Sequence, residues 1–199
     1  MGTPTIKSQQ IMTGPGLLRA APLGSTLPVV AVAASVFSHT WDAAWFELGA
    51  TDEGVTETHE TTTETVEVAE SLYPVRTATV AKAGRLEFAM AHLNVKNWLL
   101  ALNAAAGAAA TTGAAATTLT TITSPLAGAE VRYMIAWEST ETKELLIGYQ
   151  MFNGGTLAVA RRKGADKSLL PVSFAFEMPD SAVAPVPWRR YLAGTSWTT

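Results

Sequence analysis

The stretch that decides the organisation of this chain is residues 51–70, TDEGVTETHETTTETVEVAE. It contains seven of the seventeen carboxylates and only four apolar side chains, which are Val55, Val66, Val68 and Ala69. So little apolar surface cannot offset the entropy lost when the segment becomes ordered. Because threonine and valine favour strands over helices, we predict an extended acidic arm that becomes ordered against another copy of the protein.

Strands are predicted on both sides of this arm. Alternation of apolar and polar residues, as at Leu86, Phe88 and Met90, is typical of a half-buried strand. The sequence Asn153-Gly154-Gly155 tolerates positive φ and predicts a hairpin turn into a further strand. The predicted strands are residues 17–20, 44–49, 75–80, 84–92, 131–137, 144–152, 156–160 and 172–178.

One helix is predicted, and it begins after Asn94, a residue type that can cap a first turn. Apolar side chains follow at the spacing of one helical face. This apolar stripe consists of Val95, Trp98, Leu99 and Leu102. We expect it to pack on a sheet, because such stripes are most often buried in a core.

The segment at about 104–118 is rich in alanine, threonine and glycine and offers no apolar stripe. We predict a flexible loop there. Strands separated by turns, with one helix beside them, indicate a mainly β fold, either a β-sandwich or a partly closed barrel with one flanking α-helix. The 199 residues fit one domain, 1–199, with the extended arm at about 51–70.

Charge is segregated along the sequence. The formal net charge is −3, yet outside residues 51–70 fourteen cations face ten anions. A nucleic-acid-binding protein is usually basic overall, so specific DNA binding is not predicted. We also expect no membrane segment, because the apolar run 27–37 is far shorter than the ~20 residues that cross a bilayer. The first ten residues lack the apolar segment of a secretory signal.

Catalytic and metal-binding motifs are poorly matched. Residues 59–63, HETTT, begin like a zinc protease helix, but Thr63 stands where the second histidine is needed. The chain has no cysteine for a thiolate site and no Gly-x-Ser-x-Gly sequence. Glutamates crowded in a threonine-rich arm more often form a solvated face than a glycosidase pair. The sequence therefore predicts a protein that is not an enzyme and has no cofactor or metal.

Candidate interface residues come from the acidic arm and from cations in the last forty residues, which could complement the arm of a neighbouring copy. The run Trp188–Tyr191 combines residue types that anchor interfaces, although a terminal strand packing on its own domain would use the same aromatics. Both interpretations remain open at this point. The candidates are Asp52, Glu53, Glu57, Glu60, Arg161, Arg162, Lys163, Trp188, Arg189, Arg190 and Tyr191.

Five segments carry a family resemblance in order along nearly the whole chain. They are QQIMTGPG at 9–16, WFELGATDEG at 45–54, IAWE at 135–138, ARRKGAD at 160–166 and YLAG at 191–194. Together they resemble the major tail tube protein of long-tailed, siphovirus-type bacteriophages, in particular the actinobacterial phage type. The alanine-rich segment at about 104–118 is not part of that pattern.

The resemblance implies a virion structural protein with a β-sandwich and a flanking helix. Six copies would close into a ring, and rings would stack around a tape-measure protein to form the tail tube that conducts the genome. The implied partners are other copies of the chain, the tape-measure protein and tail-terminator or baseplate proteins. The implied location is the virion tail, assembled in the host cytoplasm.

A conduit must let DNA slide, and each lysine or arginine that neutralised a phosphate would hold it. An anionic or neutral bore avoids this, and the bore candidates are Glu64, Glu67 and Glu87. A second hypothesis is a virion decoration or adhesin-like β module in which the arm is a ligand loop. A weaker third is a glycan-active enzyme.

Overall fold

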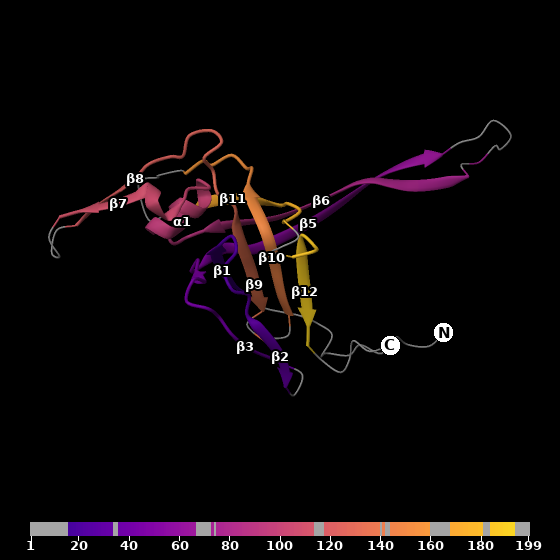
Figure 1. Ribbon diagram of the computed structural model, residues 1–199, viewed down its shortest axis with the longest axis horizontal. Helices are drawn as coiled ribbons and strands as arrows, with labels where there is room; N and C mark the ends of the chain where they lie inside the picture. The colour runs from indigo at the N-terminus through magenta and orange to yellow at the C-terminus, as the bar shows by residue number, and fades with distance from the viewer. Residues whose placement is uncertain are drawn as a thin grey trace.

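The computed structural model describes residues 16–33, 36–66, 73, 75–113, 118–139, 141, 144–159, 168–180 and 184–193. These residues form a body of antiparallel strands from which long hairpins project (Figure 1). The strands of the first half are β1 (Gly16–Pro22), β2 (Val29–Ala33), β3 (Val36–Thr40), β4 (Phe46–Glu47), β5 (Thr51–Val66) and β6 (Arg76–Met90). The second half contains α1 (Val95–Ala101), a 3-10 turn η2 (Ala106–Ala108), β7 (Ala109–Thr112), β8 (Leu119–Ile122), β9 (Tyr133–Ser139), β10 (Glu144–Asn153), β11 (Leu170–Phe176) and β12 (Trp188–Leu192).

Eight strands form one sheet in the order β4-β1-β9-β10-β11-β6-β5, and β12 also pairs with β10. The same edge of β10 therefore serves two strands: Glu144–Gly148 pairs with β12, and Met151–Asn153 pairs with β11. The pairing of β10 with β9 shifts register between Gly148 and Met151, and such a bulge bends a strand and increases its twist. The sheet thus divides at β10, with β12 on one branch and the β11-β6-β5 group on the other.

Both faces of the middle strands are buried. On one face, Tyr133 and Ile135 of β9 belong to a core that includes Leu100 of α1. On the other face, Met134 and Trp45 belong to a second core. The strand predicted at residues 131–137 corresponds to β9, which lies in the middle of the sheet and is packed on both faces. The mainly β class with one α-helix is confirmed, and the sheets formed by the described strands are not closed, so the sandwich or partly closed barrel stays a prediction.

Helix α1 starts as predicted, because the side chain of Asn94 accepts a hydrogen bond from the backbone N–H of Asn97 at 2.8 Å. The buried face differs from the predicted stripe: Asn97 and Leu100 are fully buried, and only Leu99 of the stripe is buried. Asn97 explains the rotation, since its Nδ2 donates to the carbonyls of Leu48 at 2.8 Å and of His92 at 2.7 Å. A polar side chain thus decides which face of the helix meets the sheet.

Several predicted boundaries were wrong. Segments 75–80 and 84–92 are one continuous strand, β6, and segment 44–49 contains only the two-residue β4. The predicted loop at 104–118 contains η2 and strand β7, and β7 pairs with β8 just beyond the segment. Residues 156–159 are not a strand, because β10 pairs with β11 and not with the segment that follows it in sequence.

Asn153 replaces the predicted hairpin turn with a buried hydrogen-bond network. Its Nδ2 donates to the Ala101 carbonyl at 2.7 Å, and its Oδ1 accepts from the backbone N–H of Ser173 at 3.0 Å and of Gly155 at 3.3 Å. Asn103 completes the network, since it exchanges two 2.9 Å bonds with the backbone of Asn153. The network joins the end of α1 to β10 and β11.

Candidate assembly surface

The β5–β6 hairpin is the largest projection of the molecule (Figure 1). Its inner part is backed by β11, which pairs with β6 from Arg85 to Met90. Its outer part runs from the His59–Gly84 pair to the Val66–Arg76 pair, and no third strand among the described residues pairs with it. We call this outer part the ribbon. The predicted extended conformation is observed for residues 51–66, where β6 of the same chain supplies the backbone partners, and ordering against another copy stays a prediction.

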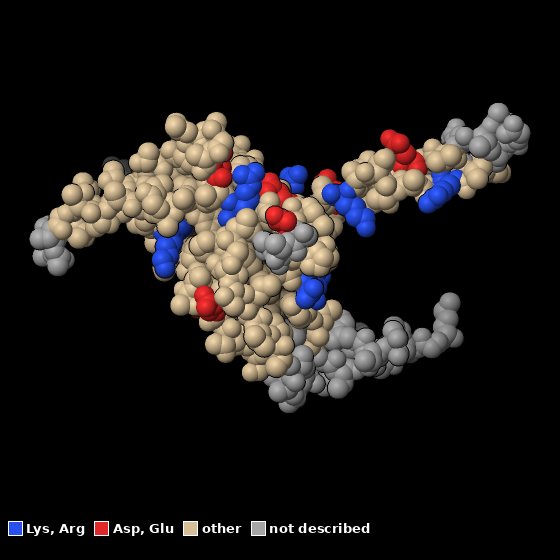
Figure 2. Space-filling view, viewed as in Figure 1, with Lys and Arg blue, Asp and Glu red and all other residues tan. Residues whose placement is uncertain are grey.

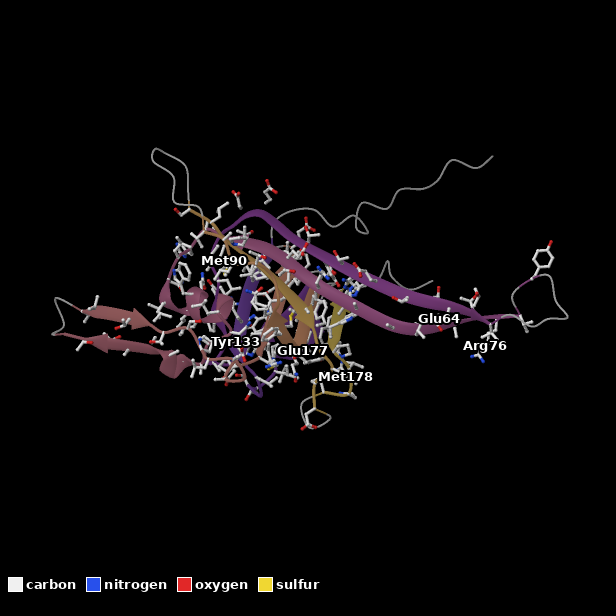
Figure 3. All side chains as sticks on the ribbon, turned by 90° about the horizontal axis from the view of Figure 1, so that it is seen from above. Glu64, Arg76, Met90, Tyr133, Glu177 and Met178 are labelled. Atoms are coloured by element: carbon white, nitrogen blue, oxygen red, sulfur yellow. The ribbon has the colours of Figure 1, made fainter. Side chains whose placement is uncertain are left out.

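The ribbon is close to electrically neutral in its described residues. Glu60 and Glu64 of β5 lie in the same ribbon as Arg76 and Lys82 of β6. Figure 2 shows both acidic and basic side chains along this projection, and Figure 3 shows Glu64 and Arg76 near its outer end. Register places Glu60 and Glu64 on one face, and His59 and the alternate threonines on the other. The acidity seen in the linear sequence is therefore compensated by the returning strand, and Glu67 lies outside the described residues.

The base of the hairpin carries an ion-pair bridge. Arg190 of β12 contacts the carboxylate of Glu57 on β5, and its Nε lies 3.1 Å from Glu144 Oε1 on β10. Glu57 also contacts the ring of His59. Burial raises the pKa of Glu144, the positive charge of Arg190 lowers it, and the nearby Glu57 raises it again. The predicted meeting of acidic arm and basic C-terminal region occurs here within one chain.

Three rings pack beside this bridge. His59 is stacked on Phe176, with ring centroids 5.9 Å apart and planes 8° apart. The ring of Trp188 lies 5.0 Å from His59 and 6.5 Å from Phe176. Neither Phe176 nor His59 was a predicted site residue. The sequence contained a signal for His59, because the alternation of side chains along β5 places Val55, Glu57 and His59 on one face.

The run 188–191 does not form one patch, because side chains of a strand alternate between faces. Trp188 packs with the core on the α1 side, whereas Tyr191 packs with the opposite core. On that second side, burial raises the pKa of Tyr149, and the neighbouring Tyr191 raises it further. Arg189 lies beside both tyrosines, and its hydrogen bond to Tyr191, together with the charges of Tyr149 and Tyr191, raises its pKa. The interpretation as a terminal strand of its own domain is the one observed for this run.

The remaining candidates lie near the start of the β5–β6 hairpin or outside the described part of the chain. Asp52 and Glu53 line a shallow hollow with Glu87 beside β11. Glu87 is half-exposed and accepts a hydrogen bond from Ser173 Oγ at 2.9 Å. The residues that lie outside the described part of the chain are Arg161, Arg162 and Lys163.

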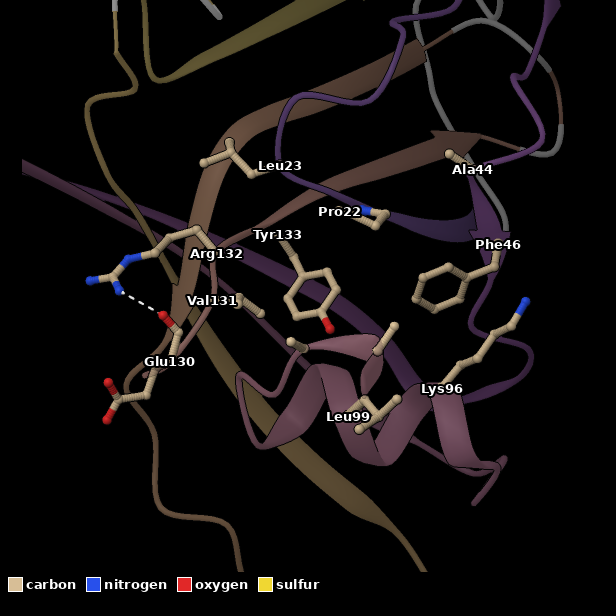
Figure 4. Close-up of a pocket in the computed structure, with 12 residues that line it drawn as sticks. Pro22, Leu23, Ala44, Phe46, Lys96, Leu99, Glu130, Val131, Arg132 and Tyr133 are labelled. Carbon is tan, nitrogen blue, oxygen red and sulfur yellow. Dashed lines mark hydrogen bonds between the residues drawn. The ribbon is translucent and has the colours of Figure 1, made fainter. Parts of the chain in front are cut away.

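An apolar groove of about 650 Å³ lies between α1 and the β1–β9 part of the sheet (Figure 4). Phe46, Leu99, Val131 and Tyr133 line it, and Lys96 stands at its edge. The Tyr133 hydroxyl donates to the carbonyl of Ala104. Lys96 Nζ lies 5.2 Å from the Phe46 ring centroid. The polar groups of the groove thus either bond within the fold, as Tyr133 does, or lie at the rim, as Lys96 does.

Within the described ranges, no group of three or more His, Asp or Glu side chains is placed to hold a metal ion. No described helix has the length and apolar character needed to cross a membrane. No protein-family model matches the chain, and no curated protein matches it.

Proposed function

We propose that this chain is a virion structural protein that self-assembles into stacked six-fold rings, which form the tail tube of a long-tailed phage. The observation that carries the proposal is the ribbon, whose residues are almost all exposed on both faces. A two-stranded ribbon is marginally stable by itself in water. A ribbon of this length is therefore best explained as an element that other copies cover.

Free strand edges support the same proposal. Among the described residues, β5 pairs only with β6 along its 16 residues, so its outer edge remains open. An open edge is a template for pairing with another chain, and proteins usually block or cover it. A contact between this edge and a different surface of the next copy is heterologous, and such contacts close into rings when the rotation permits. The family resemblance supplies the six-fold symmetry.

The charge of the hairpin suits a conduit for DNA. Its two strands carry six carboxylates, at Asp52, Glu53, Glu57, Glu60, Glu64 and Glu87, against three cations, at Arg76, Lys82 and Arg85. A bore lined by such strands would release few counterions from passing DNA and would not retain it. The proposed partners remain other copies, a tape-measure protein and tail-terminator or baseplate proteins, with DNA passing through unbound.

Size-exclusion chromatography with light scattering, followed by electron microscopy, tests the proposal on the purified chain. Six-fold rings or tubes are expected. Replacing Thr61 and Thr63 by lysine adds charge to the ribbon and should weaken assembly, whereas Ala43→Lys on an exposed turn of the body is the matched control. A monodisperse monomer at high concentration, without rings or tubes, would count decisively against the proposal.

The alternative function is a virion decoration or adhesin-like binding module. The apolar groove beside α1 favours it, because ligand sites are concave and mostly apolar. A module of this kind would remain a monomer or a small closed oligomer under the conditions of the same experiment.

A further inference from the structure

The ribbon leaves the body at one pair of residues. His59 of β5 lies opposite Gly84 of β6, and β11 supports β6 only as far as Arg85. A side-chain Cβ at Gly84 would lie 2.8 Å from Cδ2 of Phe176 and 3.0 Å from Nδ1 of His59. Phe176 therefore packs directly on the backbone at the point where the ribbon becomes free.

Strand β12, on the other branch of the sheet, also contacts the hairpin at this point. Trp188 of β12 contacts His59, and Arg190 of β12 contacts Glu57. Arg190 is in turn anchored to the body by Glu144, whose side chain is 9% exposed. Strand β12 pairs only with β10 among the described strands, so these contacts are side-chain bridges across the division of the sheet.

We propose that Trp188 and Arg190 of β12, together with Phe176, form a latch that fixes the direction in which the ribbon leaves the body. The rings hold His59 by stacking, and the guanidinium holds Glu57 two residues earlier on the same face of β5. No other described strand pairs with the ribbon beyond this point, so the latch sets its angle. Strand β12 is thereby a positioning element for a hairpin more than a hundred residues earlier in the sequence.

A small change in the angle of the ribbon produces a large displacement of its far end. The seven residue steps from His59 to Val66 span roughly 23 Å at about 3.3 Å per residue, so a pivot of about 20° moves the far end by about 8 Å. That displacement exceeds the ~4.8 Å spacing between neighbouring strands. A released ribbon would therefore present its edge out of register with any fixed partner.

The absence of cysteine allows a direct measurement of the angle. Spin labels at Thr65→Cys on the ribbon and Lys96→Cys on α1 report the distance between ribbon and body by pulsed electron paramagnetic resonance. Labelled chains are diluted into excess unlabelled protein, so that each distance lies within one chain whether or not the protein assembles. This measurement is independent of the proposed function, because ring formation is scored separately by microscopy.

The expected result is a single narrow distance distribution in the otherwise unchanged chain. Trp188→Ala should widen it by about twofold or more, because a two-stranded ribbon has little stability of its own. Arg190→Gln removes the ionic contacts and the cation–π contact with Trp188 but keeps all three rings, and it should widen the distribution to a smaller degree. It also keeps the test valid if Trp188→Ala fails to fold. Trp41→Ala is the matched control, since Trp41 packs against His39 and Trp45.

Two results would overturn the latch. One is an unchanged distribution in folded Arg190→Gln and, where it folds, in Trp188→Ala. The other is equal widening in Trp41→Ala, which would attribute the effect to general loss of stability.

Discussion

Replacing Asn153 by alanine should be among the most damaging single changes in this fold. Its buried side chain makes three hydrogen bonds, to the Ala101 carbonyl and to the N–H groups of Ser173 and Gly155. Each such bond contributes about 1 kcal/mol, and each buried group left without a partner costs about 1–3 kcal/mol. The expected loss is about 3–5 kcal/mol of unfolding free energy, a large part of the 5–15 kcal/mol typical of a domain.

The assay is urea denaturation followed by circular dichroism, with thermal unfolding as a second measure. A loss of this size should lower Tm by about 6–20 °C, at about 2–4 °C per kcal/mol for a chain of this length. Asn94→Ala is the graded control, because it removes one capping bond at an exposed helix start and should cost only about 1 kcal/mol. If Asn153→Ala proved no more destabilising than Asn94→Ala, the network would not be what holds α1 to the sheet.

Three further predictions concern charge. Because burial raises the pKa of Glu144, its stabilising contribution is present below the ordinary pKa of 4.5 and is lost as pH rises through the folded-state pKa. The urea midpoint measured against pH should therefore fall in a step, and Glu144→Gln should remove that step. A step that persists in Glu144→Gln would belong to another group. Arg190→Ala should lower the unfolding free energy by about 1 kcal/mol, since its ion pairs are partly exposed, and the same loss in a Glu57→Ala background would show that the two side chains are not coupled. Glu87→Lys should leave the fold nearly unchanged, because the side chain is half-exposed, yet slow genome ejection if it faces a bore; normal ejection by particles that contain the variant would remove Glu87 from the bore.

Local chemistry made several features predictable from the sequence. The alternation of Leu86, Phe88 and Met90 identified the inner part of β6, since one-sided burial requires a period of two. Asn94 identified the start of α1, because a capping side chain acts on backbone groups only three residues away. The extended character of residues 51–66 followed in the same way from threonine and valine content.

Tertiary structure decided which strands meet. Within the chain, β6 supplies both the backbone partners of the acidic arm and the cations Arg76 and Lys82, and no local pattern identifies that pairing. Asn153 resembled a turn residue, although its side chain bonds groups that are distant in sequence. The His59 and Trp188 contact joins strands more than a hundred residues apart, which lie on the two branches of the sheet that meet at β10. Sequence fixes the preferences of each segment, whereas long-range pairing and side-chain satisfaction choose among the arrangements that those preferences allow.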